Sequence, residues 1–194
     1  MAFTPIGSAA RGVKAPGGQQ ILRQTYDDDG IPKLPQGVLV VRQRVWPDDA
    51  GGSFKEVVRI ADGAVQAPAL REAGVEHVTA QINVSVIPPG VRRFWHVHPE
   101  QSELWTVSYG QLNGGLIDCR EGSPTFGLRS KVILTPEVGL YIPAGVAHGY
   151  ANESAGVVVL QYLPDRQWSG GADTEEWRLD PDAVPYDFVL AEVI

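Results

Sequence analysis

Short apolar runs separated by glycine and proline make up most of this chain, and Val, Ile, Thr and aromatic residues dominate the runs. This composition is typical of β-strands joined by tight turns. The pattern predicts strands at 38–46, 54–60, 76–87, 92–98, 103–109, 112–118, 129–134, 138–142, 147–151 and 156–163. Helical patterning is scarce, and only 67–73 and 173–178 could form a turn or two of helix. Many short strands indicate an all-β sandwich or barrel.

One predicted strand alternates strictly between apolar and polar positions. Thr79, Gln81, Asn83 and Ser85 take every second place in it, so its two faces differ in polarity. If the polar face points into a barrel, these side chains line a ligand cavity. The alternative is that the polar face meets solvent.

Three of the four histidines lie in two compact motifs. His96 and His98 are two residues apart on a predicted strand, so both imidazoles leave the same face. A short turn then brings Glu103 back beside them. His148 follows a second turn, which contains proline and glycine. Three imidazoles and one carboxylate suit a divalent first-row metal, and Fe, Mn, Ni, Cu, Co and Zn all remain open.

The two motifs resemble those of the cupin superfamily. Every named position of its metal pattern is present, in the order Gly90-x5-His96-x-His98-x4-Glu103-x6-Gly110 and Pro143-x-Gly145-x2-His148-x3-Asn152. The resemblance implies a double-stranded β-helix, or jelly-roll barrel, with a metal held by His96, His98, Glu103 and His148. No organic cofactor is indicated.

The chain also resembles the dTDP-4-dehydrorhamnose 3,5-epimerases, cupin-fold enzymes that work without a metal. The matching stretches are Val45–Gly51, Gln81-x-Asn83-x-Ser85, Arg93-Phe94-Trp95-His96, Asp118–Gly127 and Ile142–Gly149. The resemblance implies that His96 is a catalytic base and Tyr162 a catalytic acid, although without an alignment gap Gln161 takes the acid's place. The residues expected to orient or enclose a substrate are Gln81, Asn83, Arg93, Trp46 and Tyr150.

Some positions depart from the epimerase pattern. Glu103 stands where the family has a lysine that stabilises an enolate, Ala50 stands where it has a phosphate-binding arginine, and His98 is an added histidine. These departures favour a metal-dependent enzyme that acts on a small keto, enol or sugar-like substrate, by Lewis-acid isomerisation or epimerisation or by activating dioxygen. The alternatives are metal-independent epimerisation with His96 as base, and a non-catalytic cupin that binds a small ligand.

Composition narrows the partners and the compartment. Sixteen Lys and Arg against twenty-three Asp and Glu leave a net charge of −7, which disfavours nucleic acid as a partner. No apolar run approaches the roughly 18 residues of a membrane span. Because the N-terminus lacks an apolar signal core, a cytoplasmic location is expected. We further expect an extended arm over 1–36, a single cupin domain over 37–194, and a homodimer that covers unpaired strand edges.

Overall fold

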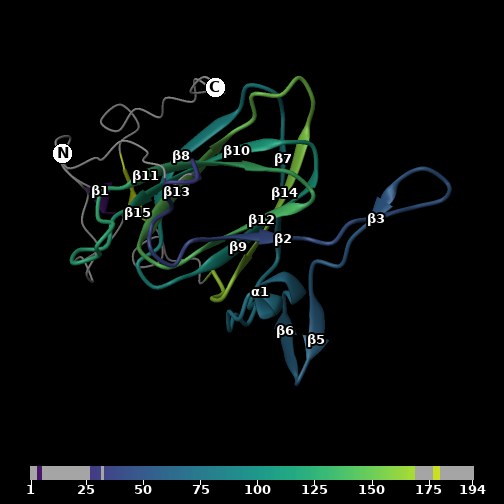
Figure 1. Ribbon diagram of the computed structural model, residues 1–194, viewed down its shortest axis with the longest axis horizontal. Helices are drawn as coiled ribbons and strands as arrows, with labels where there is room; N and C mark the ends of the chain where they lie inside the picture. Colours follow the sequence, from purple (N-terminus) through teal and green to yellow (C-terminus); the bar gives the residue numbers. More distant parts are fainter. Residues whose placement is uncertain (1–3, 6–26, 32, 169–176, 180–194) are drawn as a thin grey trace.

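The chain folds into two antiparallel β-sheets that face each other, which confirms the all-β prediction (Figure 1). The computed structural model describes residues 4–5, 27–31, 33–168 and 177–179. One sheet contains, in spatial order, β1 (Thr4–Pro5), β15 (Trp177–Arg178), β8 (Arg92–Val97), β13 (Val146–Ala151), β10 (Leu112–Asp118) and β11 (Arg129–Leu134). The other contains β2 (Leu39–Arg42), β12 (Val138–Ile142), β9 (Glu103–Tyr109), β14 (Val158–Pro164) and β7 (Asn83–Ile87).

The remaining elements lie outside these two sheets. Two small hairpins and one helix precede β7 along the chain: β3 (Trp46–Pro47) with β4 (Ser53–Phe54), β5 (Arg59–Ala61) with β6 (Ala64–Gln66), and α1 (Pro68–Glu72). Pro68 occupies the first turn of α1, where its missing N–H costs no hydrogen bond. The helix falls within the 67–73 stretch that the sequence pattern indicated.

The main hydrophobic core fills the space between the two sheets. Leu112, Leu116 and Tyr150 reach it from one sheet, while Trp105 and Leu160 reach it from the other. Facing layers of alternating side chains produce this kind of packing in a jelly roll. The outer faces are covered separately, by a cluster around Trp95 and Val97 on one sheet and by a cluster beneath α1 on the other.

Strand β7 settles which of its faces points inward. Ile87 is buried in the core between the sheets, and Asn83 and Ser85 are partly buried on the same face. Val84 and Val86 point outward and are 58% and 67% exposed. The polar face is therefore the interior one, and apolar side chains face outward on this edge strand. A polar interior wall is consistent with a ligand cavity.

The β3–β4 hairpin projects away from the barrel, at the right of Figure 1. Lys55 follows β4 directly and ties the base of the hairpin to the outer face of the five-stranded sheet. Its Nζ donates hydrogen bonds to Gln43 Oε1 at 2.7 Å, Thr106 Oγ1 at 2.6 Å, Val107 O at 2.6 Å and Pro136 O at 3.1 Å. Burial lowers the pKa of Lys55 to about 8, against the opposing effect of the nearby carboxylate of Glu137.

Several predicted boundaries differ from the observed ones. The single strands expected over 38–46 and 54–60 are instead β2 and parts of the two small hairpins. Most of the arm expected over 1–36 lies outside the described residues, as does most of the turn of helix expected over 173–178; the part of the latter that is described belongs to β15. Among the described residues, no helix is both long and apolar enough to cross a membrane.

Candidate functional site

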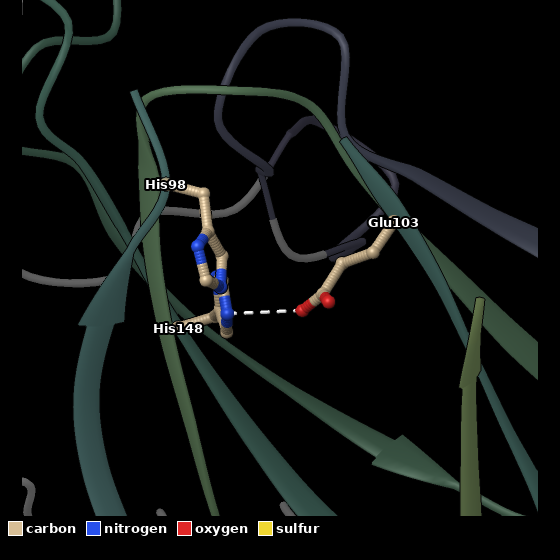
Figure 2. Close-up of side chains that lie close together, drawn as sticks. All are labelled: His98, Glu103 and His148. Carbon is tan, nitrogen blue, oxygen red and sulfur yellow. Dashed lines mark ion pairs between the residues drawn. The ribbon is translucent and has the colours of Figure 1, made fainter. Parts of the chain in front are cut away.

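A buried carboxylate and a buried imidazole lie within hydrogen-bonding distance of each other between the two sheets (Figure 2). Glu103 opens β9, and His148 lies in the middle of β13. The Nε2 atom of His148 is 2.9 Å from Oε1 of Glu103, and the two residues are only 4% and 3% exposed. The indole N–H of Trp105 donates to the same carboxylate oxygen at 2.7 Å.

The hydrogen bonds of His148 favour its imidazolium form. Its Nδ1 lies 3.0 Å from the carbonyl oxygen of Val146, while Nε2 faces the Glu103 carboxylate. Both partners can only accept, so each ring nitrogen must carry a proton. Burial raises the pKa of Glu103, but the charge and hydrogen bond of His148, the charge of His98 and the Trp105 hydrogen bond outweigh burial and lower that pKa to about 2.

The other two motif histidines stand beside this pair. The ring of His98 is 5.4 Å from that of His148, and ligand atoms of His98, Glu103 and His148 all lie within 4.8 Å of one another. His96 pairs with His148 across β8 and β13, with ring centroids 6.3 Å apart and nearly parallel planes. Three of the four predicted ligands thus form one group, and His96 stands next to that group without belonging to it.

A β-bulge in β8 sets the direction of two predicted site residues. His96 pairs with His148 and Arg93 pairs with Tyr150, so two residues of β8 lie opposite the single residue Gly149. Cross-strand partners share a face, and Tyr150 packs into the interior core. The bulge therefore turns both Arg93 and His96 toward the interior face. Bulges re-aim side chains in this way beside many active sites.

Gly149 permits this bulge because it has no side chain. A Cβ there would overlap the ring of Phe94 and lie 2.6 Å from the carbonyl oxygen of Arg93. We expect Gly149→Ala to lower the free energy of unfolding by about 1–3 kcal/mol, as overpacking does. Urea denaturation measures the change. Gly156→Ala is the matched control, because a Cβ at Gly156 meets nothing within 4 Å; equal losses in the two variants would contradict the prediction.

Tyr162, and not Gln161, faces the interior. Tyr162 packs against the core between the sheets, on the same face as Leu160. Gln161 points to the other face of β14, and its Oε1 is buried without a hydrogen-bond partner among the described residues. The alternation of β14 therefore places the side chain of Tyr162 on the interior wall.

The expected substrate residues do not all lie together. Gln81 Nε2 donates to Asn83 Oδ1 at 2.6 Å, and the backbone N–H of Trp168 donates to Gln81 Oε1 at 3.1 Å. Asn83 pairs with Tyr162 across β7 and β14, so this polar pair adjoins the interior tyrosine. Trp46 instead lies in the projecting hairpin, where its ring is 5.6 Å from that of Phe54.

Two residues that shape the structure around the site, Gly149 and Asp118, could not be identified from the sequence. Gly149 was visible only as part of a family signature, because a bulge cannot be located until the partner strand is known. Asp118 likewise lies in a stretch that matches the family, and the sequence alone gives it no role. The signal in the sequence is an aspartate that is closely followed by Arg120, Ser123 and Thr125. All three side chains can donate hydrogen bonds to a carboxylate, so the spacing indicates a cluster around Asp118.

The two-sheet barrel and its interior histidines define a cupin-type protein. Residues 34–186 match the family described as dTDP-4-dehydrorhamnose 3,5-epimerase, and the chain belongs to that family. The enzyme of that name from Streptomyces griseus is 32% identical over 156 residues, which cover 78% of this chain and 74% of the relative. The Mycobacterium tuberculosis enzyme is 34% identical over 119 residues, which cover 54% of this chain and 59% of the relative.

Solved structures show the same relationship. The Legionella pneumophila 3,5-epimerase in complex with dTDP-4-keto-L-rhamnose superposes with a TM-score of 0.63 and 25% identity, covering 80% of each chain. The Bacillus anthracis dTDP-4-dehydrorhamnose 3,5-epimerase with TDP and PPi bound gives a TM-score of 0.60 and 28% identity, covering 72% of this chain and 78% of that one.

The prediction of a metal-dependent enzyme, and of a divalent metal cofactor, is wrong. The chain belongs to a family whose members work without a metal, which also removes the dioxygen-activating alternative. The error has a physical reason, because the residue types that ligate a metal also form ion pairs with one another. Here the carboxylate of Glu103 is engaged by His148 and Trp105.

Proposed function

We propose that this protein is a metal-independent epimerase of a dTDP-4-keto-6-deoxyhexose. The observation that carries the proposal is the family match over 34–186, together with an interior wall that holds the expected base and acid. His96 faces the interior opposite His148, and Tyr162 faces it from β14. A keto sugar is acidic beside its carbonyl, which is the chemistry that a histidine base and a tyrosine acid perform.

In the proposed reaction, His96 removes the proton on the carbon beside the ketone. The electrons move into an enolate, and Tyr162 returns a proton to the opposite face of that carbon, which inverts it. Since Glu103 and His148 form a neutral pair, we assign the positive charge that stabilises the enolate to Arg93, which the bulge aligns with Tyr150. Gln81, Asn83 and Tyr150 are assigned to orienting the sugar.

The experiment that tests the proposal is solvent exchange on dTDP-4-keto-6-deoxyglucose. In heavy water, proton NMR should show deuterium entering the carbons beside the ketone as the epimer accumulates. Exchange at one carbon would identify a single-centre epimerase, and exchange at two would identify a 3,5-epimerase. Binding of the sugar nucleotide without exchange at any carbon would overturn the proposal.

Metal removal should leave this activity unchanged. Because the proposed proton transfers use only side chains, exhaustive dialysis against EDTA should not alter turnover by more than the error of the assay. The measurement is the initial rate before and after dialysis, with residual metal determined by elemental analysis. A loss of rate that Zn²⁺, Mn²⁺, Ni²⁺ or Fe²⁺ restores would contradict the metal-independent mechanism.

We also propose that residues 37–194 form the cupin domain, that 1–36 form an arm, and that the protein is a homodimer. The family match begins at residue 34, which supports the boundary. Trp46 and Phe54 are 44% and 63% exposed on a hairpin directed away from its own barrel, and exposed apolar surface of this kind is covered in oligomers.

Sedimentation velocity tests the homodimer. The protein should sediment at twice the chain mass, and the double variant Trp46→Ser with Phe54→Ser should sediment as a monomer. Sedimentation of the unaltered protein at the mass of one chain, at the concentration used for assay, would rule the homodimer out.

A further inference from the structure

One cluster of polar side chains lies outside the proposed active site, at the end of β10. The carboxylate of Asp118 has no exposed surface. It accepts hydrogen bonds from the backbone N, Nε and Nη2 of Arg120 at 3.0, 2.9 and 2.8 Å, from Ser123 Oγ at 2.6 Å and from Thr125 Oγ1 at 2.5 Å. We call Asp118, Arg120, Ser123 and Thr125 the Asp118 cluster.

The Asp118 cluster cannot act on a substrate directly, because its carboxylate is buried and surrounded by its own donors. Although burial raises the pKa of Asp118, the hydrogen bonds from Arg120, Ser123 and Thr125 more than offset it and lower that pKa. Charge-assisted hydrogen bonds of this kind are short and directional. The cluster therefore holds its loop in one conformation.

The Asp118 cluster also holds the chain that leads into β2. Arg120 Nη2 donates to the carbonyl oxygen of Gln36 at 2.6 Å, and the backbone N–H of Gln36 donates to Thr125 Oγ1 at 2.9 Å. Gly37 lies against Pro143, the first residue of the turn before β13. The cluster thus joins the end of β10 to two other segments.

From this junction, backbone hydrogen bonds run to the histidines. The N–H of Cys119 donates to the carbonyl oxygen of Gly145 at 3.2 Å, and the N–H of Gly145 donates to that of His98 at 2.8 Å. Asp118 itself pairs in register with Val146, whose carbonyl oxygen lies 3.0 Å from Nδ1 of His148. Two successive hydrogen bonds through Gly145 therefore connect the loop of the cluster to His98, and the β10–β13 pairing connects it directly to the strand that carries His148.

We propose that the Asp118 cluster is a positioning element that fixes the placement of His98 and His148. It acts through the Gly145 turn, and it touches no reacting atom. The expected effect of the cluster on turnover rests on the proposed function. The placement of the imidazoles does not, because it can be measured without a substrate. His148 pairs across the strands with His96, the proposed base, so a displaced His148 also displaces that base. A misplacement of about 1 Å at a catalytic group costs about 100-fold in rate.

Imidazole NMR of the histidine-labelled protein tests the placement directly. Ser123→Ala and Thr125→Val each remove one hydroxyl donor to Asp118 and leave the Arg120 bonds in place. The imidazole signals of His98 and His148 should shift in both variants, while those of His77, bonded through Nε2 to Leu163 O at 3.0 Å, should stay. Signals are assigned by single-histidine variants.

The matched control is Ser154→Ala, which removes a 2.7 Å hydroxyl bond to Asn152 Oδ1 at another turn. It should leave the imidazole signals of His98 and His148 unchanged. Unchanged signals of these two histidines in folded Ser123→Ala and Thr125→Val proteins would overturn the proposal, as would equal shifts in Ser154→Ala.

Kinetics supply the second readout. In Ser123→Ala and Thr125→Val, kcat should fall by about 10-fold to 100-fold with KM nearly unchanged, and Ser154→Ala should match the unaltered protein. An unchanged kcat in both cluster variants would overturn the link to turnover. If the unaltered protein turns over no keto sugar while the imidazole signals shift as expected, the proposed function fails and the positioning inference stands.

Discussion

Replacing His96 with asparagine should lower kcat/KM for the keto sugar by about 100-fold to 10,000-fold, which is the usual contribution of a general base. Asparagine preserves polarity and much of the volume but cannot accept the proton, so both epimerisation and solvent exchange should be lost together. Steady-state rates and deuterium incorporation, measured on the same samples, give the two quantities.

His77→Asn is the matched control, since His77 lies on the outer side of β14 and its Nε2 bonds the carbonyl oxygen of Leu163. This variant should retain turnover once it is shown to be folded. Retention of turnover by His96→Asn would exclude His96 as the base. Of the motif histidines, His98 would then become the base to test next, because both ring nitrogens of His148 already carry a proton.

Tyr162→Phe separates the acid from the base. If Tyr162 only returns the proton, the variant should still lose substrate protons to His96. Deuterium should therefore enter the sugar while the inverted product fails to accumulate, because His96 returns deuterium to the face from which it removed the proton. Proton NMR in heavy water distinguishes the two outcomes. Normal product formation by the phenylalanine variant would assign the acid to another group.

Glu103→Gln should be among the most destabilising single changes in the interior, with a loss of about 3–5 kcal/mol in the free energy of unfolding. The change leaves the His148 imidazolium buried without its counter-charge, and breaking a buried pair in this way costs that amount. Guanidinium denaturation, followed by fluorescence, measures it. The exposed Glu76→Gln provides the control, and a cost for Glu103→Gln below about 1 kcal/mol would show that the pair contributes little.

The same pair gives a pH dependence with a definite sign. The pKa of Glu103 is lowered from 4.5 to about 2, so the carboxylate form is favoured by folding. Its stabilisation is complete above pH 4.5 and is lost as the pH falls toward about 2. The free energy of unfolding should therefore decline over this interval, and Glu103→Gln should decline less steeply than the unaltered protein.

The strands of the barrel could be predicted because their periodicity is local. The runs at 103–109, 112–118, 129–134 and 138–142 coincide with β9, β10, β11 and β12. The chain between β2 and β7 was harder, since its small hairpins are two or three residues per strand and leave almost no alternation. The interior face of β7 could be identified only from the folded sheet. Alternation in the sequence shows that the two faces differ in polarity, but it does not show which of them faces the core.

For the candidate site, the sequence predicted which side chains come together but not what they bind. Spacing correctly predicted that His98, Glu103 and His148 would converge, since that follows from strand alternation and turn length. It could not reveal whether these groups bind an ion or one another. That outcome depends on the indole of Trp105 and the carbonyl of Val146, which satisfy the Glu103–His148 pair from positions that carry no motif.

Lys55 anchors the β3–β4 hairpin through contacts that are separate from the packing inside the barrel. Its four oxygen partners belong to Gln43, Thr106, Val107 and Pro136. Tyr162, the proposed acid, packs instead into the core between the two sheets. Substitutions at Lys55, or insertions in the hairpin, could therefore change its direction or its length during evolution without any change in the packing of the interior. The β3–β4 hairpin is therefore a part of this fold that can change in sequence without altering the side chains that line the interior.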